Sequence, residues 1–315
     1  MSQKFPTALS TKIGRRSAIT LGARVAPSAT QVIIRILVLL LALAVIYVLT
    51  GLNSQHKIAP YTILSDKVDG AVRFALITDF HSNTYGDGQS ELLRSLEEQN
   101  PDAVLIGGDL FDERKAHRPS FELIGELTRA YPCYYVTGNH DIWTLESDSL
   151  IRRLKEAGVN VLQGECQNFD VRGQTIAICG IDDPEAELYF AKPTAIEQQL
   201  ETVARATRGG RYTILIAHRP EQIGRYLNHP FDLVVCGHAH GGQWIVPGLI
   251  NGVYAPHQGL FPHYAGGRYD FDGATMIVSR GLDREMTRIP RLHNRPELVM
   301  IEINPGGGDN KKRDD

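Results

Sequence analysis

Acidic, amide and imidazole side chains follow five apolar segments of the sequence, each where the apolar run ends. In chain order these groups are Asp79 with His81, Asp109 with Asp112, Asn139 with His140 and Asp141, His218, and His238 with His240. Oxygen and imidazole ligands of this mixture suit Mn, Fe or Zn, whereas a structural zinc site usually recruits cysteine. Extended backbone points residues two apart to the same side, so we expect both Asp79 with His81 and His238 with His240 to converge on an ion.

Each group taken alone has an ordinary explanation, because a polar turn, a helix cap or a buried histidine would account for it. Five groups at five strand ends are better explained together, since ligands of α/β proteins bind outside the carboxyl ends of strands. Neighbouring glycines would allow the backbone to approach an ion or a phosphate closely; they are Gly107, Gly108, Gly138 and Gly237. The pattern therefore predicts a metal site at the carboxyl ends of the strands.

Buried strands that alternate with amphipathic helices must position these groups. Helical spacing of apolar residues predicts helices over 90–99, 119–130 and 147–157. Short apolar runs predict strands over 72–78, 103–107, 133–137, 176–181, 212–217, 232–236, 275–279 and 297–303. This alternation favours an α/β protein with mostly buried sheets.

Charge divides the 315 residues into two parts. Residues 1–65 contain no Asp or Glu and seven Lys or Arg, whereas residues 66–315 contain 36 acidic and 26 basic residues, a net charge of −10. Non-specific nucleic-acid binding requires a basic face, so no nucleic-acid partner is expected for the acidic part.

Residues 32–52 form an apolar run that is long enough to cross a membrane. Twenty-one helical residues span roughly 31 Å, about the thickness of a hydrocarbon core. Six Lys or Arg precede or enter this run, and only Lys57 and Lys67 follow closely. The positive-inside rule then places the N-terminus in the cytoplasm and residues after 52 outside it.

Three other targeting signals compete with an uncleaved signal anchor. A twin-arginine signal would need its apolar region soon after Arg15 and Arg16, but Arg24 and Pro27 intervene. A cleaved signal peptide would have an unusually long basic leader and lacks an A-x-A-like site after the apolar run. The basic, acid-free residues 1–31 also fit a mitochondrial transit peptide. We favour the signal anchor.

These observations predict five segments along the chain. They are a basic cytoplasmic segment (1–31), a transmembrane signal anchor (32–52), a linker (53–71), a globular domain that carries the five ligand groups (72–304) and a disordered tail (305–315).

The four cysteines form no C-x-x-C pair. Three of them lie in apolar strands, where a free cysteine behaves as a small hydrophobic residue. We expect four free thiols at Cys133, Cys166, Cys179 and Cys236, with Cys166–Cys179 as the best alternative for a disulfide.

Taken together, the motifs resemble those of the calcineurin-like metallophosphoesterases. D-x-H at 79–81, G-G-D-x-x-D at 107–112, G-N-H-D at 138–141, a single histidine after a strand, and G-H-x-H at 237–240 occur in the order of that family. The longer G-H-A-H-G-G-Q at 237–243, with the later S-R-G-L and N-R-P-E-L, is similar to a bacterial, often membrane-associated branch. The resemblance covers about 72–304 and implies a four-layer αββα sandwich of two mixed sheets, here preceded by one transmembrane helix.

The resemblance also implies a site for two divalent metal ions. The first ion would be held by Asp79, His81, Asp109 and His240, and the second by the shared Asp109 with Asn139, His218 and His238. His140 matches the histidine that stabilises or protonates the leaving oxygen. Asp112 and Asp141 would orient ligands or loop backbone, and Arg280 and Arg295 are candidates for phosphate or head-group contacts.

The activity implied by the resemblance is that of a membrane-anchored phosphohydrolase, most simply a phosphodiesterase. Its nucleophile would be a hydroxide shared by two Mn, Fe or Zn ions, and its substrate a lipid-linked or cell-envelope phosphoester. One alternative is the UDP-2,3-diacylglucosamine pyrophosphate hydrolase of lipid A synthesis, although that lipid is made on the cytoplasmic face. Another is a non-catalytic sensor or scaffold, which would be expected to have lost a ligand or His140, and none is lost.

Overall fold

The computed structural model describes residues 27–144, 146–207, 209–284 and 290–306. It divides into two units, one up to Tyr47 and the other from Val48 onward. Most of the predicted basic segment 1–31 and most of the predicted tail 305–315 lie outside the described residues.

One helix among the described residues is long and apolar enough to cross a membrane. This helix, α1 (Ala29–Gly51), begins three residues before the start of the predicted span 32–52 and ends one residue before the end of that span. Its length and composition agree with an anchor, but the same properties occur in a signal sequence.

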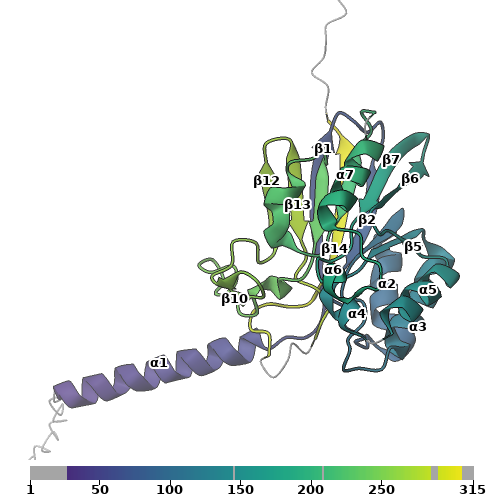
Figure 1. Ribbon diagram of the computed structural model, residues 1–315. Helices are drawn as coiled ribbons and strands as arrows, with labels where there is room; N and C mark the ends of the chain where they lie inside the picture. The colour runs from purple at the N-terminus through teal and green to yellow at the C-terminus, as the bar shows by residue number, and fades with distance from the viewer. Residues whose placement is uncertain (1–26, 145, 208, 285–289, 307–315) are drawn as a thin grey trace, which may run out of the picture. The chain divides into compact units, whose positions relative to one another are not determined.

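Two six-stranded mixed sheets form the centre of the second unit (Figure 1). The first sheet has the order β1 (Lys57–Ser65), β14 (Glu297–Pro305), β2 (Val72–Ile77), β3 (Ala103–Gly107), β4 (Cys133–Val136) and β5 (Asn160–Val161). Its only antiparallel pair, among the described residues, is β14 with β2. The second sheet has the order β12 (Gly267–Phe271), β13 (Ala274–Val278), β9 (Leu233–Cys236), β8 (Thr213–Ile216), β7 (Gln174–Gly180) and β6 (Glu165–Val171). Its outer pairs are antiparallel, and its inner pairs are parallel.

Alternation of side chains along the strands sorts the apolar residues into layers. In β2, Phe74 and Leu76 enter the core that the two sheets share, whereas Ala75 and Ile77 enter a second core on the other face. In β8, Ile214 enters the shared core and Leu215 enters a third core on the outer face of the second sheet. A sheet buried on both faces needs apolar residues at consecutive positions, as these strands have.

Helices cover the two outer faces. Leucines and isoleucines of α2 (Ser90–Gln99), α3 (Arg118–Ala130) and α5 (Ser147–Glu156) pack into the second core. Side chains of α7 (Ile196–Ala206) and α8 (Ile223–Tyr226) pack into the third. The predicted four-layer αββα sandwich is therefore confirmed.

Short elements complete the connections. They are α4 (Asn139–Trp143), α6 (Ala186–Tyr189), the 3₁₀ turns η1 (Asp87–Gln89), η2 (Pro220–Gln222) and η3 (His240–Gly242), and a small ribbon of β10 (Tyr254–Ala255) and β11 (Gly259–Leu260).

The predicted linker 53–71 contains an unpredicted strand. Residues 57–65 form β1, which pairs in parallel with β14 along its whole length. Pro60 interrupts an otherwise β-prone run and hides this strand from the sequence pattern. Because β1 lies at the edge of the sheet, a proline without an N–H is tolerated there. This part of the linker prediction is wrong.

The expectation of four free thiols is also wrong. Cys166 and Cys179 form a disulfide across the antiparallel pair β6–β7, where they are register partners. Arg172 and Gly173 both have positive φ, so a tight two-residue turn sets this register. Cys133 and Cys236 are free and buried, as predicted.

Candidate metal centre

Loops that follow five strands carry the seven predicted ligands and bring six of them together, and the seventh, Asn139, lies buried beside His140 at the start of α4, after β4. These loops follow β2, β3 and β4 of the first sheet and β8 and β9 of the second. All seven residues are buried, with at most 6% of any of them exposed: Asp79, His81, Asp109, Asn139, His218, His238 and His240. The site thus lies where the ends of the two sheets meet.

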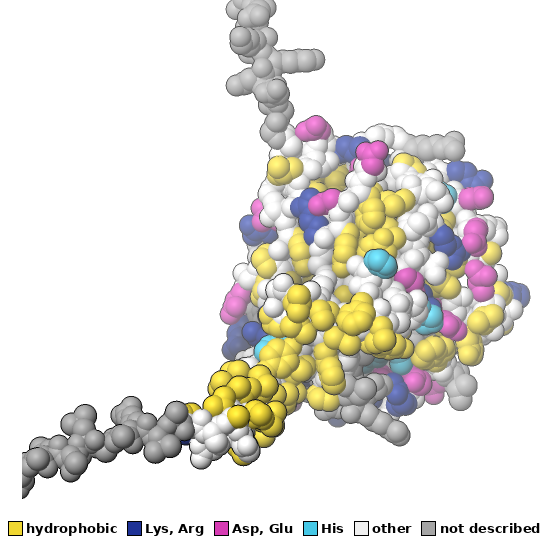
Figure 2. Space-filling model, turned by 90° about the vertical axis from the view of Figure 1, so that its left-hand side faces the viewer, with side chains coloured by type: hydrophobic (Ala, Val, Ile, Leu, Met, Phe, Trp, Pro, Cys, Tyr) yellow, Lys and Arg dark blue, Asp and Glu magenta, His cyan; other side chains and the backbone are white. Residues whose placement is uncertain are grey.

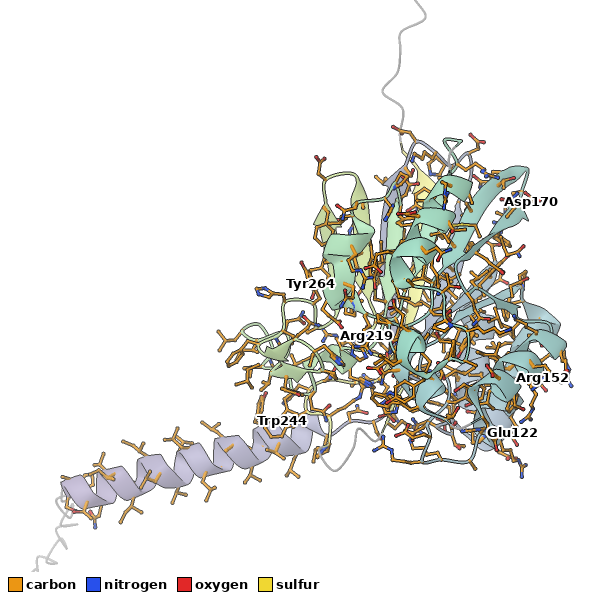
Figure 3. The ribbon with its side chains drawn as sticks, viewed as in Figure 1. Glu122, Arg152, Asp170, Arg219, Trp244 and Tyr264 are labelled. Atoms are coloured by element: carbon orange, nitrogen blue, oxygen red, sulfur yellow. A yellow bond between two sulfur atoms is a disulfide. The ribbon has the colours of Figure 1, made fainter. Side chains whose placement is uncertain are left out.

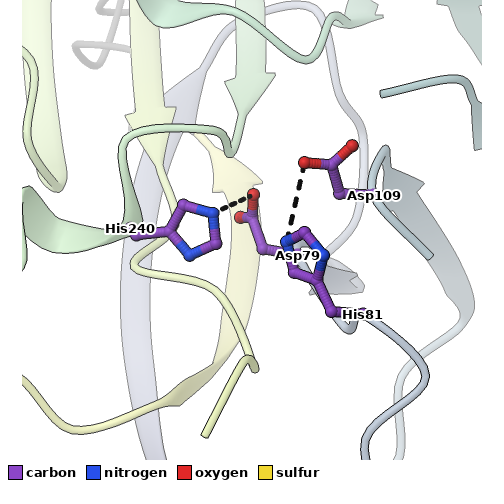
Figure 4. Close-up of side chains that lie close together, drawn as sticks. All are labelled: Asp79, His81, Asp109 and His240. Atoms are coloured by element: carbon purple, nitrogen blue, oxygen red, sulfur yellow. Dashed lines mark ion pairs between the residues drawn. The ribbon is translucent and has the colours of Figure 1, made fainter. Parts of the chain in front are cut away.

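A first group of four side chains could hold one ion. Ligand atoms of Asp79, His81, Asp109 and His240 all lie within 4.8 Å of one another (Figure 4). Nε2 of His240 is 3.5 Å from Oδ1 of Asp79, and Nε2 of His81 is 3.6 Å from Oδ2 of Asp109. These four residues are the predicted first site.

A second group shares Asp109 with the first. Ligand atoms of Asp109, His218 and His238 also lie within 4.8 Å of one another. Nε2 of His218 is 3.1 Å from Oδ2 of Asp109 and 3.2 Å from Nδ1 of His238. The same carboxylate oxygen therefore faces histidines of both groups, which is the position a bridging ligand requires.

Several buried polar atoms in these groups form no hydrogen bond with any residue that the structure describes. They are Oδ2 of Asp79, both ring nitrogens of His81, Oδ2 of Asp109 and Oδ1 of Asn139. A buried polar atom without a partner costs about 1–3 kcal/mol, so native proteins rarely leave several together. Carboxylate, amide and imidazole atoms of this kind are ligands for divalent cations, and the residues present fit such ions.

Left-handed backbone, and not extended strand, produces the convergence of the paired ligands. The extended geometry expected for Asp79–His81 and His238–His240 is wrong, because β2 ends at Ile77 and β9 ends at Cys236. Positive φ values occur instead at Asp79 (49°), His81 (47°), Asp109 (52°), His238 (63°) and His240 (46°). Such conformations cost of order 1–3 kcal/mol each and gather at functional sites.

Two glycines make room for ligand side chains. A Cβ on Gly138 would lie 2.2 Å from Oδ1 of Asp109, and a Cβ on Gly237 would lie 2.5 Å from Oδ2 of Asp79. Both distances are too short for any side chain. The close approach predicted at these glycines is thus an approach to carboxylate ligands.

Asp141 and Asp112 support the site in different ways. Asp141 accepts hydrogen bonds from the backbone N–H groups of Gly138 and Phe111, and so joins the loops after β4 and β3. Burial, with the charge of Asp109, raises the pKa of Asp141 to about 6. Oδ2 of Asp112 lies 3.4 Å from Nδ1 of His81.

The four histidines among the ligands divide into two electrostatic classes. Burial lowers the pKa of His81, but Asp112 and Asp109 outweigh burial and raise it to about 9. Burial likewise lowers the pKa of His218, and Asp109 outweighs it and raises the value to about 10. Burial lowers the pKa values of His238 and His240 well below the usual value, and neighbouring histidines add to this effect. A cation entering the site would therefore displace protons from His81 and His218.

His140 stands beside the ligands and is held from two directions. Its backbone N–H donates to Oδ1 of Asp109 at 2.8 Å, and its Nδ1 lies 2.7 Å from Oε2 of Glu113. Its ring packs edge-on against His81 and Trp143. Sequence reasoning missed Glu113, although this residue directly follows the second aspartate of the G-G-D-x-x-D motif.

The two arginines predicted to contact phosphate donate hydrogen bonds to backbone carbonyl groups. Arg280 donates to the carbonyls of Gly241 and Asn251, and Arg295 donates to those of Gln55 and His56. Their role in phosphate binding stays a prediction.

Two residues that sequence reasoning missed contact ligands directly. Nη2 of the buried Arg291 lies 3.4 Å from Nδ1 of His240. Nδ1 of His257 lies 2.9 Å from Nε2 of His238. Neither residue belongs to a motif that could have indicated it.

A pocket opens beside Trp143, next to His140. Its volume is about 460 Å³. Trp143, Arg152, Tyr189 and Phe190 are among the residues that line it. Glu146 and Asp148 also line it, so the pocket offers acidic as well as apolar, aromatic and cationic groups, and Trp143 connects it to the ring of His140.

A buried Asp/His cluster at the strand ends of an αββα sandwich is the arrangement that the resemblance to metal-dependent phosphoesterases implies. The family model for the calcineurin-like phosphoesterases matches residues 72–242, and the chain belongs to this family. The family that the motifs indicated is thereby confirmed. The narrower branch indicated by G-H-A-H-G-G-Q stays a prediction.

Curated relatives include one from Helicobacter pylori, named an uncharacterized metallophosphoesterase. It is 31% identical over 234 residues, which are 72% of this chain and 59% of the relative. Phosphodiesterase YaeI of Escherichia coli is 29% identical over 65% of this chain and 72% of its own length. A Danio rerio protein named "Transmembrane protein with metallophosphoesterase domain" is 28% identical over 64% of this chain. The chain spans only 59% of the Helicobacter relative and 48% of the Danio relative.

Proposed function

We propose that the chain is a membrane-anchored phosphodiesterase that uses two divalent metal ions and acts outside the cytoplasm. The observation that carries this proposal is the shared carboxylate of Asp109. Its Oδ2 faces His81 of one ligand group and His218 of the other. The name of the Escherichia coli relative supports a phosphodiester substrate.

In this proposal the first ion is held by Asp79, His81, Asp109 and His240, and the second by Asp109, Asn139, His218 and His238. Bound there, the ions would neutralise charge on the phosphoryl oxygens and acidify the attacking water. Ligands of these types bind Mn, Fe and Zn and are not selective for one of the three.

The chain's own residues would handle the leaving group. Glu113 holds Nδ1 of His140, which leaves Nε2 as the atom that would give a proton to the leaving oxygen. The hydrogen bond from the His140 backbone to Asp109 fixes this ring beside the ligands. General acid catalysis of this kind contributes about 10²–10⁴-fold. The pocket beside Trp143 would receive part of the leaving group.

Two observations support an extracytoplasmic position for the catalytic domain. The excess of Lys and Arg before the apolar run follows the positive-inside rule. The Cys166–Cys179 disulfide is a bond that persists in oxidising compartments and is rare in the cytosol. Both count against the cytoplasmic hydrolysis of UDP-2,3-diacylglucosamine. The proposed chain consists of an N-terminal membrane anchor and a catalytic domain, and the domain includes β1 (residues 57–65).

A hydrolysis panel tests the proposal. The purified full chain, loaded with Mn, Fe or Zn, is given bis(p-nitrophenyl) phosphate, p-nitrophenyl phosphate, UDP-2,3-diacylglucosamine and phosphatidylglycerol, with Asp109→Asn as the control. We expect metal-dependent cleavage of phosphodiesters and a weaker activity on the monoester. Preferred cleavage of the pyrophosphate bond would overturn the phosphodiesterase assignment, and metal binding with no hydrolysis of any substrate would favour the scaffold alternative.

A further inference from the structure

A long uncharged segment follows the last metal-ligand motif. Residues 241–267 contain no Asp, Glu, Lys or Arg, although 22% of the whole chain is charged. This segment begins directly after His240 and includes β10 and β11. A stretch of 27 residues without a charge is unusual for the surface of an acidic domain.

The segment exposes large apolar side chains to the surroundings. Between 42% and 80% of each is accessible, and together we call them the apolar loop surface: Trp244, Leu249, Tyr254, Leu260 and Phe261. Figure 2 views the side on which β10 lies in Figure 1, and hydrophobic side chains gather there over the lower part of the second unit. Trp244 and Tyr264, labelled in Figure 3, mark the same region.

The small ribbon keeps these side chains outward. Tyr254 and Leu260 are register partners in the antiparallel pair β10–β11, so their side chains lie next to each other on one face. The backbone N–H of Phe261 donates to the carbonyl of Val253, which fixes the neighbouring residue. The exposure therefore comes from an ordered element.

The same ribbon is joined to the metal centre. His257 lies in the turn between β10 and β11, and its Nδ1 is 2.9 Å from Nε2 of His238. Val253 donates a backbone hydrogen bond to Gly242, within the turn that begins at His240. The apolar loop surface is thus attached to the rim of the catalytic site.

A lipid surface fits these properties better than a charged partner. Contiguous exposed apolar side chains mark interaction sites, and tryptophan and tyrosine favour the membrane interface. Only residues 52–56 separate α1 from β1, so the chain can hold the domain at most about 20 Å from the end of an inserted α1. Residues 241–267 carry no Lys or Arg that could attract anionic head groups, so burial of apolar area is the expected driving force.

We propose that the apolar loop surface inserts into the interface of the membrane that α1 anchors. This insertion places the opening of the metal centre at the level of lipid head groups, where a lipid-linked phosphoester would meet it. The inference rests on the membrane anchor of the proposed function.

Tryptophan fluorescence can test this insertion, because the chain contains only Trp143 and Trp244. The full chain is reconstituted into phosphatidylcholine vesicles that carry brominated acyl chains, which quench nearby tryptophan. Trp143→Phe leaves Trp244 as the reporter, and Trp244→Phe leaves Trp143 as the control. We expect strong quenching of Trp244, weak quenching of Trp143, and the same result at low and high salt.

Surface variants provide the matched comparison. In the Trp143→Phe background, the combined change Leu249→Ser, Leu260→Ser and Phe261→Ser should reduce the quenching of Trp244 to the level of Trp143. Leu64→Ser with Leu188→Ser changes two equally exposed leucines outside the surface and should have no effect.

The outcomes separate this inference from the proposed anchor. Failure of the full chain to float with the vesicles would refute the anchor. Flotation with equal quenching of both tryptophans would refute only the insertion. Conversion of a dimer to a monomer by the triple change, measured by sedimentation in detergent, would show that the surface joins two copies and would also refute it.

Discussion

The backbone N–H of His140 donates a hydrogen bond to Oδ1 of Asp109 at 2.8 Å. This contact leaves Oδ2 of Asp109 as the atom that faces His81 and His218. One carboxylate therefore connects both ligand groups through one oxygen and positions the predicted acid through the other. Changes at Asp109 and at His140 should consequently have different effects.

Asp109→Asn should weaken metal binding by both ligand groups. The amide has no negative charge to share between two cations, so we expect less than about half of the wild-type metal content. Metal analysis of the purified full chain measures this directly. Asp102→Asn, a change at a carboxylate that pairs with Arg172 on the surface, is the control and should keep its metal. Full metal content in Asp109→Asn would show that this residue is not a shared ligand.

His140→Ala should keep its metal and lose turnover. We expect a fall of about 10²–10⁴-fold in kcat for a phosphodiester with an alkoxide leaving group. The loss should be much smaller with a p-nitrophenolate leaving group, which needs no proton. Equal losses for both leaving groups would contradict the general-acid role.

Glu113→Gln should reproduce part of the His140→Ala effect. The carboxylate holds Nδ1 of His140 at 2.7 Å, and a neutral amide would hold the ring less firmly. We expect kcat to fall by about tenfold, with KM and metal content unchanged. An unchanged kcat in this variant would show that Glu113 does not position His140.

Gly138→Ala should damage the site through Asp109. The added Cβ would lie 2.2 Å from Oδ1 and 2.4 Å from the backbone nitrogen of Asp109, so the carboxylate must move. We expect loss of metal together with destabilisation by about 1–3 kcal/mol. The control is Gly125→Ala in α3, where a Cβ meets nothing within 4 Å and should stabilise the helix by about 1 kcal/mol. Retention of metal in Gly138→Ala would contradict the close packing described here.

Stability should depend on pH in opposite ways with and without metal. The pKa of His81 is raised to about 9 and that of His218 to about 10, above the ordinary value of 6.5. When a histidine has a higher pKa in the folded than in the unfolded chain, its protonation stabilises the fold. This stabilisation is complete below the pKa of the unfolded chain and is lost as the pH rises through the pKa of the folded chain. From pH 7 to 8.5 the Tm of the chelator-treated chain should therefore begin to fall. The Tm of the metal-loaded chain should rise over the same range, because metal binding releases protons. Parallel curves would contradict the assignment of both histidines as ligands.

The gathering of the candidate ligands could be predicted from the sequence, whereas their backbone geometry could not. Motifs such as D-x-H and G-H-x-H identify chemical groups, and six of the seven predicted ligands come together in the fold. That they bind metal stays a prediction. Their left-handed φ values have no signature in the sequence, because Asp and His occupy that region only when surrounding contacts hold them there.

Contacts between distant segments explain the other differences. β1 contains strand-forming residues but also Pro60, which argues against a strand in the sequence and is tolerated only because β1 lies at the edge of the sheet. The disulfide depends on the register of β6 and β7, which the turn at Arg172 and Gly173 sets. Arg291 and His257 reach the ligands from loops that carry no motif, so only the folded chain identifies them.

The central claim is that two metal ions share Asp109. A crystal structure of the Mn-loaded full chain, with anomalous diffraction, tests it most directly. The account predicts two anomalous peaks roughly 3.5–4 Å apart, both in contact with Oδ2 of Asp109. The first should also contact Asp79, His81 and His240, and the second should contact Asn139, His218 and His238. A single peak, or two peaks of which one does not contact Asp109, would contradict the account.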